Sequence, residues 1–239
     1  MLDKISFQTV LFLDIETVPQ VYEYTALSEE MKTLWDKKTR FFKKENDTPE
    51  DIYKRAGVYA EFAKIVCISL GFIEKQNNEN TFHIKSLYGD DEKKILIGFN
   101  ELLVTHYSKK TVLLCAHNGK EFDFPFLARR MLINGIKLPE ALDMAGKKPW
   151  EVNHLDTLEL WKFGDYKNFT SLNLLAAVFN IPTPKDDMEG SQVAQVYWEE
   201  KNLERIVTYC QKDVLTVAQL LLRFKGEELI DDKNIFIGD

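Results

Sequence analysis

The chain has 239 residues, 45% of them hydrophobic, and a formal net charge of -7. This size is sufficient for one large domain or two small ones with a sizeable core, and the negative charge excludes a protein that coats nucleic acid by charge alone. The longest apolar run, near residues 65–72, is too short to cross a bilayer. The three cysteines have no metal-type spacing, and without a signal peptide they indicate reduced thiols and a cytoplasmic location.

A buried strand is predicted at residues 9–17, and it ends with two carboxylates, Asp14 and Glu16. Because side chains alternate between the faces of a strand, both carboxylates point the same way. Neighbouring carboxylates raise each other's pKa, and a hard cation such as Mg²⁺ or Mn²⁺ would relieve their repulsion. The Asp-x-Glu pattern alone is more often a solvated acidic loop.

Residues 20–63 are predicted to form a helical insertion after this strand. Apolar residues recur at helical spacing over 27–35, and Thr48-Pro49 followed by two acids is a helix start. Residues 37–44 (KKTRFFKK) combine five cations with two aromatic rings, which is the composition of a surface that grips single-stranded nucleic acid. A solvated helix face with both rings tucked beneath it explains the same residues equally well.

The remaining periodicity predicts four more strands and five helices. The strands are expected at residues 64–73, 81–88, 111–116 and 153–158, with a hairpin turn at 74–80. The helices are expected at residues 90–103, 124–133, 172–179, 190–200 and 202–224. These elements predict one α/β domain over residues 1–239, with a central mixed five-stranded sheet flanked by helices.

Polar residues follow the fourth predicted strand. His117 and Asn118 come directly after it, at the end of the strand where ligands bind in such sheets. Asp123 directly precedes the helix that comes next. Capping that helix, with Pro125 in its first turn, is a sufficient structural reason for Asp123.

The last predicted helix carries a carboxylate on its inward side. Asp213 lies between Ile206 and Leu220 on a helical wheel, where an ionised carboxylate is costly unless it is paired. Tyr209 lies one turn earlier on the same face. An arginine partner for Asp213, and core packing for Tyr209, are the purely structural explanations.

Four acids and a phenol in this order resemble the DEDD superfamily of 3′–5′ exonucleases in its tyrosine form, and most of all the stand-alone PolB-like proofreading exonuclease domain. The three motifs would be Asp14-Ile15-Glu16, His117-Asn118 through Phe122-Asp123, and Tyr209-x-x-x-Asp213. The stretches Lys185-Asp186-x-Met188-x-Gly190-Ser191 and Tyr209-Cys210-x-x-Asp213-Val214 are similar to the same branch. The resemblance implies a ribonuclease H-like fold, and it assigns no role to the insertion.

The resemblance also implies an activity: stepwise release of nucleoside 5′-monophosphates from the 3′ end of nucleic acid, with single-stranded DNA preferred and RNA possible, by two divalent ions. It implies that Asp14, Glu16 and Asp213 hold the ion that activates water. Asp14 would bridge to the second ion, Asp123 would bind mostly through water, and Tyr209 would orient the attacking water. The implied contacts to the terminal nucleotide come from Thr17, His117, Asn118 and Phe122.

Three alternatives remain open at this point. The first is an exoribonuclease or RNA-end trimmer, since no residue shows what would recognise a 2′-hydroxyl. The second is a catalytically silent nucleic-acid-binding module of the same fold, against which the presence of all five residues argues. The third is a structural α/β protein with acidic strand ends and no metal.

Overall fold

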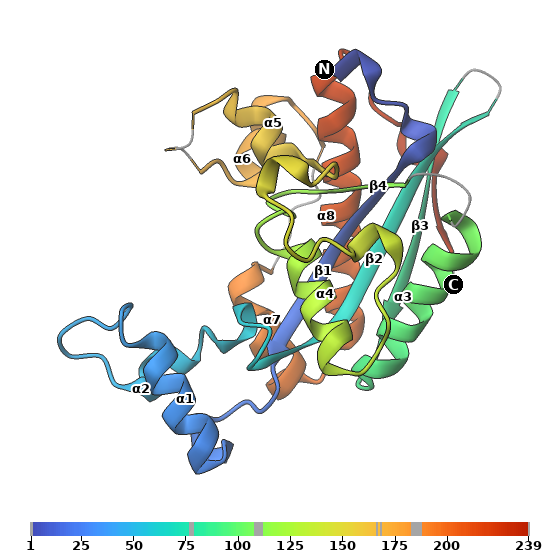
Figure 1. Ribbon diagram of the computed structural model, residues 1–239. Helices are drawn as coiled ribbons and strands as arrows, with labels where there is room; N and C mark the ends of the chain where they lie inside the picture. Colours follow the sequence, from blue (N-terminus) through green and yellow to red (C-terminus); the bar gives the residue numbers. More distant parts are fainter. Residues whose placement is uncertain are drawn as a thin grey trace.

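The computed structural model describes residues 2–76, 79–107, 112–165, 167, 169–182 and 188–238. Six strands form one mixed sheet in the order β5-β4-β1-β2-β3-β6 (Figure 1). They are β1 (Val10–Pro19), β2 (Ala63–Gln76), β3 (Glu79–Tyr88), β4 (Leu113–Ala116), β5 (Leu155–Asp156) and β6 (Ile235–Gly238). β2 pairs antiparallel with both β1 and β3. The other three pairs, β4 with β1, β5 with β4 and β6 with β3, are parallel.

The expected α/β architecture with a helix-flanked mixed sheet is confirmed, but the expected number of five strands was wrong. The sixth strand, β6, pairs with β3 at the edge of the sheet. Its sequence, Ile-Phe-Ile-Gly, does not alternate between apolar and polar residues and so carries no period-2 pattern. The β2–β3 pairing also continues to Gln76 and Glu79, into residues predicted as a turn. Thr111, Lys185 and Asp186 lie outside the described residues.

The two faces of the sheet are covered by different helices. α8 (Leu203–Phe224) lies along one face and contacts β1, β2 and β3, while α3 (Glu92–Tyr107) and α4 (Asp123–Ile133) pack on the other (Figure 1). The alternation along β1 matches this arrangement. Leu11, Leu13 and Ile15 belong to the core on the side of α3 and α4, and Val10 and Phe12 to the core under α8.

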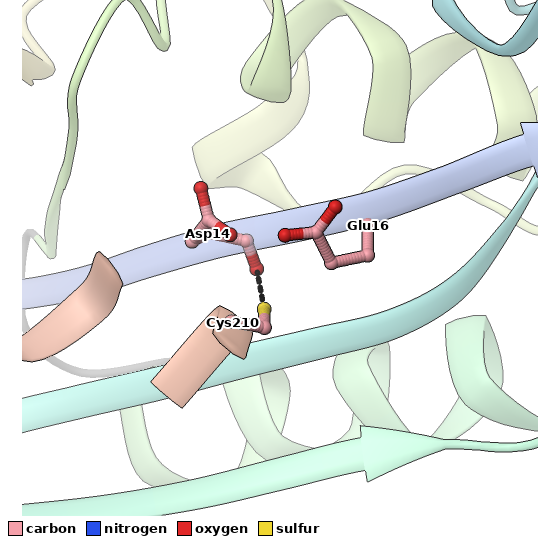
Figure 2. A group of neighbouring side chains, drawn as sticks. All are labelled: Asp14, Glu16 and Cys210. Carbon is pink, nitrogen blue, oxygen red and sulfur yellow. Dashed lines mark hydrogen bonds between the residues drawn. The ribbon is translucent and has the colours of Figure 1, made fainter. Parts of the chain in front are cut away.

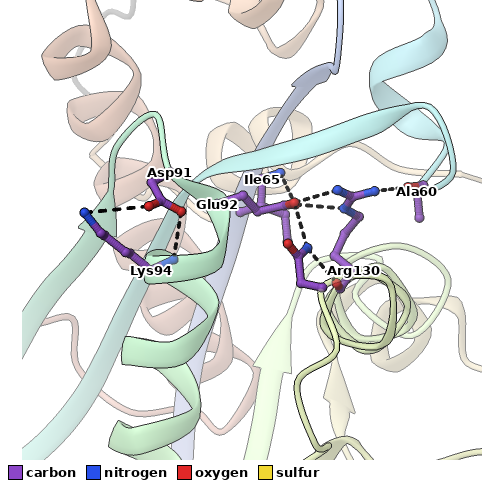
Figure 3. Close-up of polar contacts among 7 residues, drawn as sticks. Ala60, Ile65, Asp91, Glu92, Lys94 and Arg130 are labelled. Atoms are coloured by element: carbon purple, nitrogen blue, oxygen red, sulfur yellow. Dashed lines mark hydrogen bonds and ion pairs between the residues drawn. The ribbon is translucent and has the colours of Figure 1, made fainter.

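A buried ion pair positions α4 against its neighbours. Arg130 of α4 binds the Glu92 carboxylate of α3 through both Nε and Nη2, and its Nη1 donates to the carbonyl of Ala60 (Figure 3). The Glu92 carboxylate also accepts from the main-chain N–H of Ile65 at the start of β2. Three segments that are distant in sequence, residues 60–65, α3 and α4, therefore meet at one buried ion pair. Asp123 stands at the other end of α4.

The insertion forms an arm with its own small core. Its helices, α1 (Glu29–Thr39) and α2 (Pro49–Tyr53), stand away from the sheet at the lower left of Figure 1. Trp35 is fully buried and makes edge-to-face contacts with the rings of Tyr53, Tyr59 and Phe62. Thr48 caps α2, as predicted. The helical insertion is therefore confirmed as a structural unit.

The remaining helical segments are short. They are α5 (Thr157–Lys162), α6 (Leu172–Val178), capped by Ser171 as expected, α7 (Val193–Gln195) and a π-helical turn at Val196–Glu200. The predicted helix over 190–200 is thus a run of 3-10, α and π turns. Of the helices in the described ranges, none combines the length and the apolarity needed to span a membrane.

Candidate active site

Asp14 and Glu16 continue the α8-facing side of β1. Figure 2 shows their carboxylates side by side on the strand, with Cys210 of α8 donating from its thiol to the main-chain carbonyl of Asp14 at 3.4 Å. One ligand atom from each of the three residues lies within 4.8 Å of the others. The predicted pairing of Asp14 and Glu16 on one face is therefore seen in the structure.

These two carboxylates lie between two apolar clusters. Val10 and Phe12 belong to one cluster, and Val18 belongs to the next. Burial is the main reason why the pKa of Asp14 and that of Glu16 are raised well above their usual range, and the carboxylates of Asp123 and Asp213 add to both shifts. Such a site disfavours a full set of negative charges unless a cation is present.

α8 supplies the remaining acid and the phenol. The Tyr209 hydroxyl hydrogen-bonds to Asp213, and both residues interact electrostatically with Asp14 and Glu16. Burial, and then the charge of Asp213, raise the pKa of Tyr209 above its usual value, so the phenol keeps its proton at neutral pH. Tyr209 also packs at the edge of an apolar cluster with Val207, which fits the structural explanation as well.

Asp123 reaches the site from the opposite face of the sheet. β4 pairs with β1 only as far as Phe12, which leaves the edge of β1 beyond that residue open on this side. The Asp123 carboxylate accepts a hydrogen bond from the main-chain N–H of Ile15 there. Burial raises the pKa of Asp123 to about 7.

The expectation that Asp123 caps α4 was wrong. The N-cap position belongs to Phe122, which makes no side-chain cap hydrogen bond, and Asp123 is the first helical residue. Its side chain turns toward β1 because the open strand edge offers it a donor. The structure therefore removes N-capping as the reason for an aspartate at this position.

Two buried carboxylate oxygens show whether these residues fit a metal ion, because neither is used in a hydrogen bond among the residues that the structure describes. Asp14 Oδ2 and Asp123 Oδ1 are buried, and neither has a hydrogen-bond partner within the described part of the chain. Buried polar atoms are normally satisfied, so these two are available as ligands. An all-oxygen carboxylate set suits Mg²⁺ or Mn²⁺. The donor set therefore fits divalent cations.

The loop between β4 and α4 is held by Asp156, a residue to which the sequence assigned no role. Asp156 accepts hydrogen bonds from the main-chain N–H groups of Asn118, Lys120 and Leu158. Asn118 adopts a left-handed backbone conformation with φ 63°, which asparagine tolerates. A Cβ atom on Gly119 would lie 2.5 Å from that of Ala116. Thus the Asn-Gly turn also has a structural reason.

Three of the predicted substrate-binding side chains make contacts within the protein. One His117 ring nitrogen pairs with the Thr157 hydroxyl and the other with the carbonyl of Thr170, and burial lowers the pKa of this histidine. The Thr17 hydroxyl donates to the carbonyl of Gly57 at 2.7 Å. Phe122 packs against Phe126. All three residues lie near the acids in sequence, but these contacts serve the fold.

Cys210 is the second residue near the acids without a role assigned from the sequence. Its thiol lies beside Asp14 and also hydrogen-bonds with Cys67, which pairs with Glu16 across β1 and β2. Burial raises the pKa of Cys210 well above its usual value, so the group stays a neutral thiol. An apolar helical position beside Tyr209 gave no sequence signal for this placement.

Comparison with known families decides what this constellation belongs to. Residues 58–231 match the family described as "Predicted 3'-5' exonuclease related to the exonuclease domain of PolB". The chain belongs to this family. The match includes Asp123, Tyr209 and Asp213, whereas Asp14 and Glu16 precede it.

The chain is also similar to part of a DNA polymerase. A DNA polymerase of Pyrococcus glycovorans is 24% identical over 121 residues. These residues are 45% of this chain and 15% of the polymerase. The similarity thus concerns only a small part of that polymerase.

Proposed function

We propose that this protein is a metal-dependent 3′–5′ exonuclease that acts on DNA, preferentially on single-stranded ends, and releases nucleoside 5′-monophosphates. The observation that supports it most directly is that the carboxylates of Asp123 and Asp213 interact electrostatically with those of Asp14 and Glu16, and that the Tyr209 phenol interacts with three of these four acids. Membership of the PolB-related family gives the reaction class. DNA is the favoured substrate because the matched relative is a DNA polymerase.

Asp14, Glu16, Asp123 and Asp213 are the proposed ligands of two divalent ions, Mg²⁺ or Mn²⁺. Two such ions, when bound, activate the attacking water and stabilise the departing 3′ oxygen. The orphaned oxygens of Asp14 and Asp123 are the atoms with free coordination capacity. Asp156 stays in a positioning role, because its carboxylate already accepts several main-chain hydrogen bonds.

Tyr209 is proposed to position the attacking water. Its raised pKa keeps the hydroxyl protonated, so it acts as a hydrogen-bond partner and not as a base. Its hydrogen bond to Asp213 orients it toward the carboxylate cluster. A phenol held in this way restricts the water to one direction of attack, which lowers the entropic part of the barrier.

The terminal nucleotide is proposed to lie along the open edge of β1, against the β4–α4 loop. Thr17 would contribute its main chain, because its hydroxyl is already bound to Gly57. Asn118 and the exposed part of the Phe122 ring lie on the loop that ends at Asp123. His117 would contribute only its ring surface, since both nitrogens are engaged.

The test is digestion of 5′-labelled linear single-stranded DNA, duplex DNA and RNA with Mg²⁺ or Mn²⁺, with Asp14→Ala and a chelator as controls. We expect a ladder of shortened products from the linear single strand first, since its terminal base is already unpaired, and no products from Asp14→Ala. Cleavage of circular single-stranded DNA at the same rate would show an endonuclease instead. Faster digestion of RNA would favour the RNA-end trimmer.

A further inference from the structure

The arm presents an exposed aromatic and basic patch at residues 37–44. The Phe41 side chain is 78% exposed and that of Phe42 is 54% exposed. Of the two explanations that the sequence left open, the one with both rings tucked beneath a helix is therefore wrong. The guanidinium of Arg40 stacks on Phe41 at 4.5 Å from the ring centroid, so the patch combines a cation and an aromatic surface at one point.

The patch is supported from below. Thr39, the last residue of α1, is fully buried and donates from its hydroxyl to the carbonyl of Trp35. The indole of Trp35 in turn donates to the carbonyl of Pro49 at the start of α2. These contacts fix the end of α1 just before the two phenylalanines, so the exposure of their rings follows from how the arm packs.

The charge of the patch is opposite to that of the whole chain. Residues 37–44 carry five cations, whereas the protein has a net charge of -7. Lys38 pairs with Glu61, and Lys43 pairs with Asp36. Within the described ranges no ion pair involves Lys37, Arg40 or Lys44, which leaves three cations for an external anion.

The arm is joined to the chain next to the acidic cluster. β1 enters the arm directly after Glu16 and Thr17, and the hydroxyl of Thr17 ties β1 to Gly57 in the returning segment. The main-chain N–H of Gln20 donates to the carbonyl of Phe62 and closes the base of the arm. The base of the arm is therefore tied to the strand that carries two of the proposed metal ligands.

We propose that residues 37–44 bind single-stranded nucleic acid on the 5′ side of the terminal nucleotide. Unpaired bases would stack on Phe41 and Phe42, and phosphates would contact Lys37, Arg40 and Lys44. This inference rests on the proposed exonuclease function for the identity of the ligand. It assigns the insertion a role in holding the strand whose end is hydrolysed.

The test compares Phe41→Ala/Phe42→Ala with the wild type. The loss of one stacked base alone weakens binding about fivefold or more. The double variant should therefore bind a long single strand at least that much more weakly, as measured by fluorescence anisotropy in chelator. Hydrolysis of the p-nitrophenyl ester of thymidine 5′-monophosphate stays at the wild-type rate, because this substrate has no nucleotide on the 5′ side that could contact residues 37–44. In the triple variant Lys37→Gln/Arg40→Gln/Lys44→Gln, the negative slope of log affinity against log salt concentration becomes smaller in magnitude by about 2, because three phosphate contacts are lost.

Trp150→Ala is the matched control. Trp150 is also exposed, with the ammonium of Lys148 over its ring at 5.2 Å, but it lies outside the arm. Its loss leaves strand binding unchanged, and melting curves of all variants match the wild type since every replaced side chain is partly or fully accessible. Wild-type affinity of the phenylalanine variant, or an equal loss in Trp150→Ala, overturns the proposal. Anisotropy reports on the arm even if the wild type hydrolyses no phosphodiester, so the two proposals fail separately.

Discussion

The Tyr209 hydroxyl donates a hydrogen bond to the carboxylate of Asp213, one turn further along α8. The same phenol interacts electrostatically with Asp14 and Glu16 on β1. One helix therefore contributes an acid and a protonated hydroxyl to a site whose other acids come from a strand and from a second helix. The Tyr209 hydroxyl is the atom at which a structural role and a catalytic role predict different results.

We expect Tyr209→Phe to lower kcat by about 10²-fold or more, because positioning and acid–base groups contribute roughly 10²–10⁴-fold. Its KM should change little, since the hydroxyl is proposed to act on water. Single-turnover rates with saturating Mn²⁺ measure the effect. The control is Tyr197→Phe, which also loses a hydrogen bond from a phenol to a carboxylate, here that of Asp90, which is not a proposed metal ligand. Equal rates for Tyr209→Phe and the wild type would make Tyr209 structural.

The metal-free protein should lose stability as the pH rises from about 4 to about 7. The folded-state pKa of Asp123 is about 7, above an unfolded value of about 3.9. The folded state therefore favours the protonated acid, and this contribution is present below the unfolded pKa and lost as the pH rises through the folded one. Urea unfolding in chelator at several pH values measures it.

Asp123→Asn provides the internal comparison for that experiment. It removes the charge and retains an oxygen that can accept from the N–H of Ile15, so in chelator it should unfold at higher urea than the wild type near pH 7. Added Mn²⁺ should stabilise the wild type more than the variant, since a ligand that binds only the folded state raises its stability. A wild type that responds neither to pH nor to Mn²⁺ would contradict a shared acidic site.

Arg130→Ala should destabilise the protein by roughly 3–5 kcal/mol, because it leaves the Glu92 carboxylate buried without its counter-charge. The double variant Arg130→Met/Glu92→Met should recover much of this loss, since replacing a buried ion pair by apolar side chains is often neutral. Arg129→Ala, at the exposed neighbouring position, is the control. Chemical unfolding measures all three. A small effect of Arg130→Ala would show that the ion pair does not hold α4 in place.

Stability with metal bound should fall as the pH decreases from about 7 to 5, in part through His154. Nδ1 of this histidine accepts from the N–H of Leu114, and Nε2 donates to the carbonyl of Ala141. Burial lowers its pKa in the folded state, so its contribution is present above the unfolded pKa of about 6.5 and is lost below it. His154→Gln should show a weaker pH dependence than the wild type. His106→Gln, at an exposed position, should match the wild type.

The sequence by itself determined the features that depend on local periodicity. The two-residue period of a strand placed Asp14 and Glu16 on one face, and the helical period placed Tyr209 and Asp213 on the inward side of α8. Both placements agree with the structure. Local hydrogen bonding likewise identified the helix starts at Thr48 and Ser171.

Only the tertiary structure decided which distant segments meet and which side chains stay in water. Asp123 turns to Ile15 because β4 ends early and leaves the edge of β1 open. Cys210 reaches the carbonyl of Asp14 across 196 residues of sequence, and β6 completes the sheet from the far end of the chain. The exposed rings of the arm depend in the same way on how α1 packs against α2. The residue pattern of a helix or strand predicts which of its faces is apolar. It does not predict which other element covers that face, because the contacts between elements form only when the chain folds.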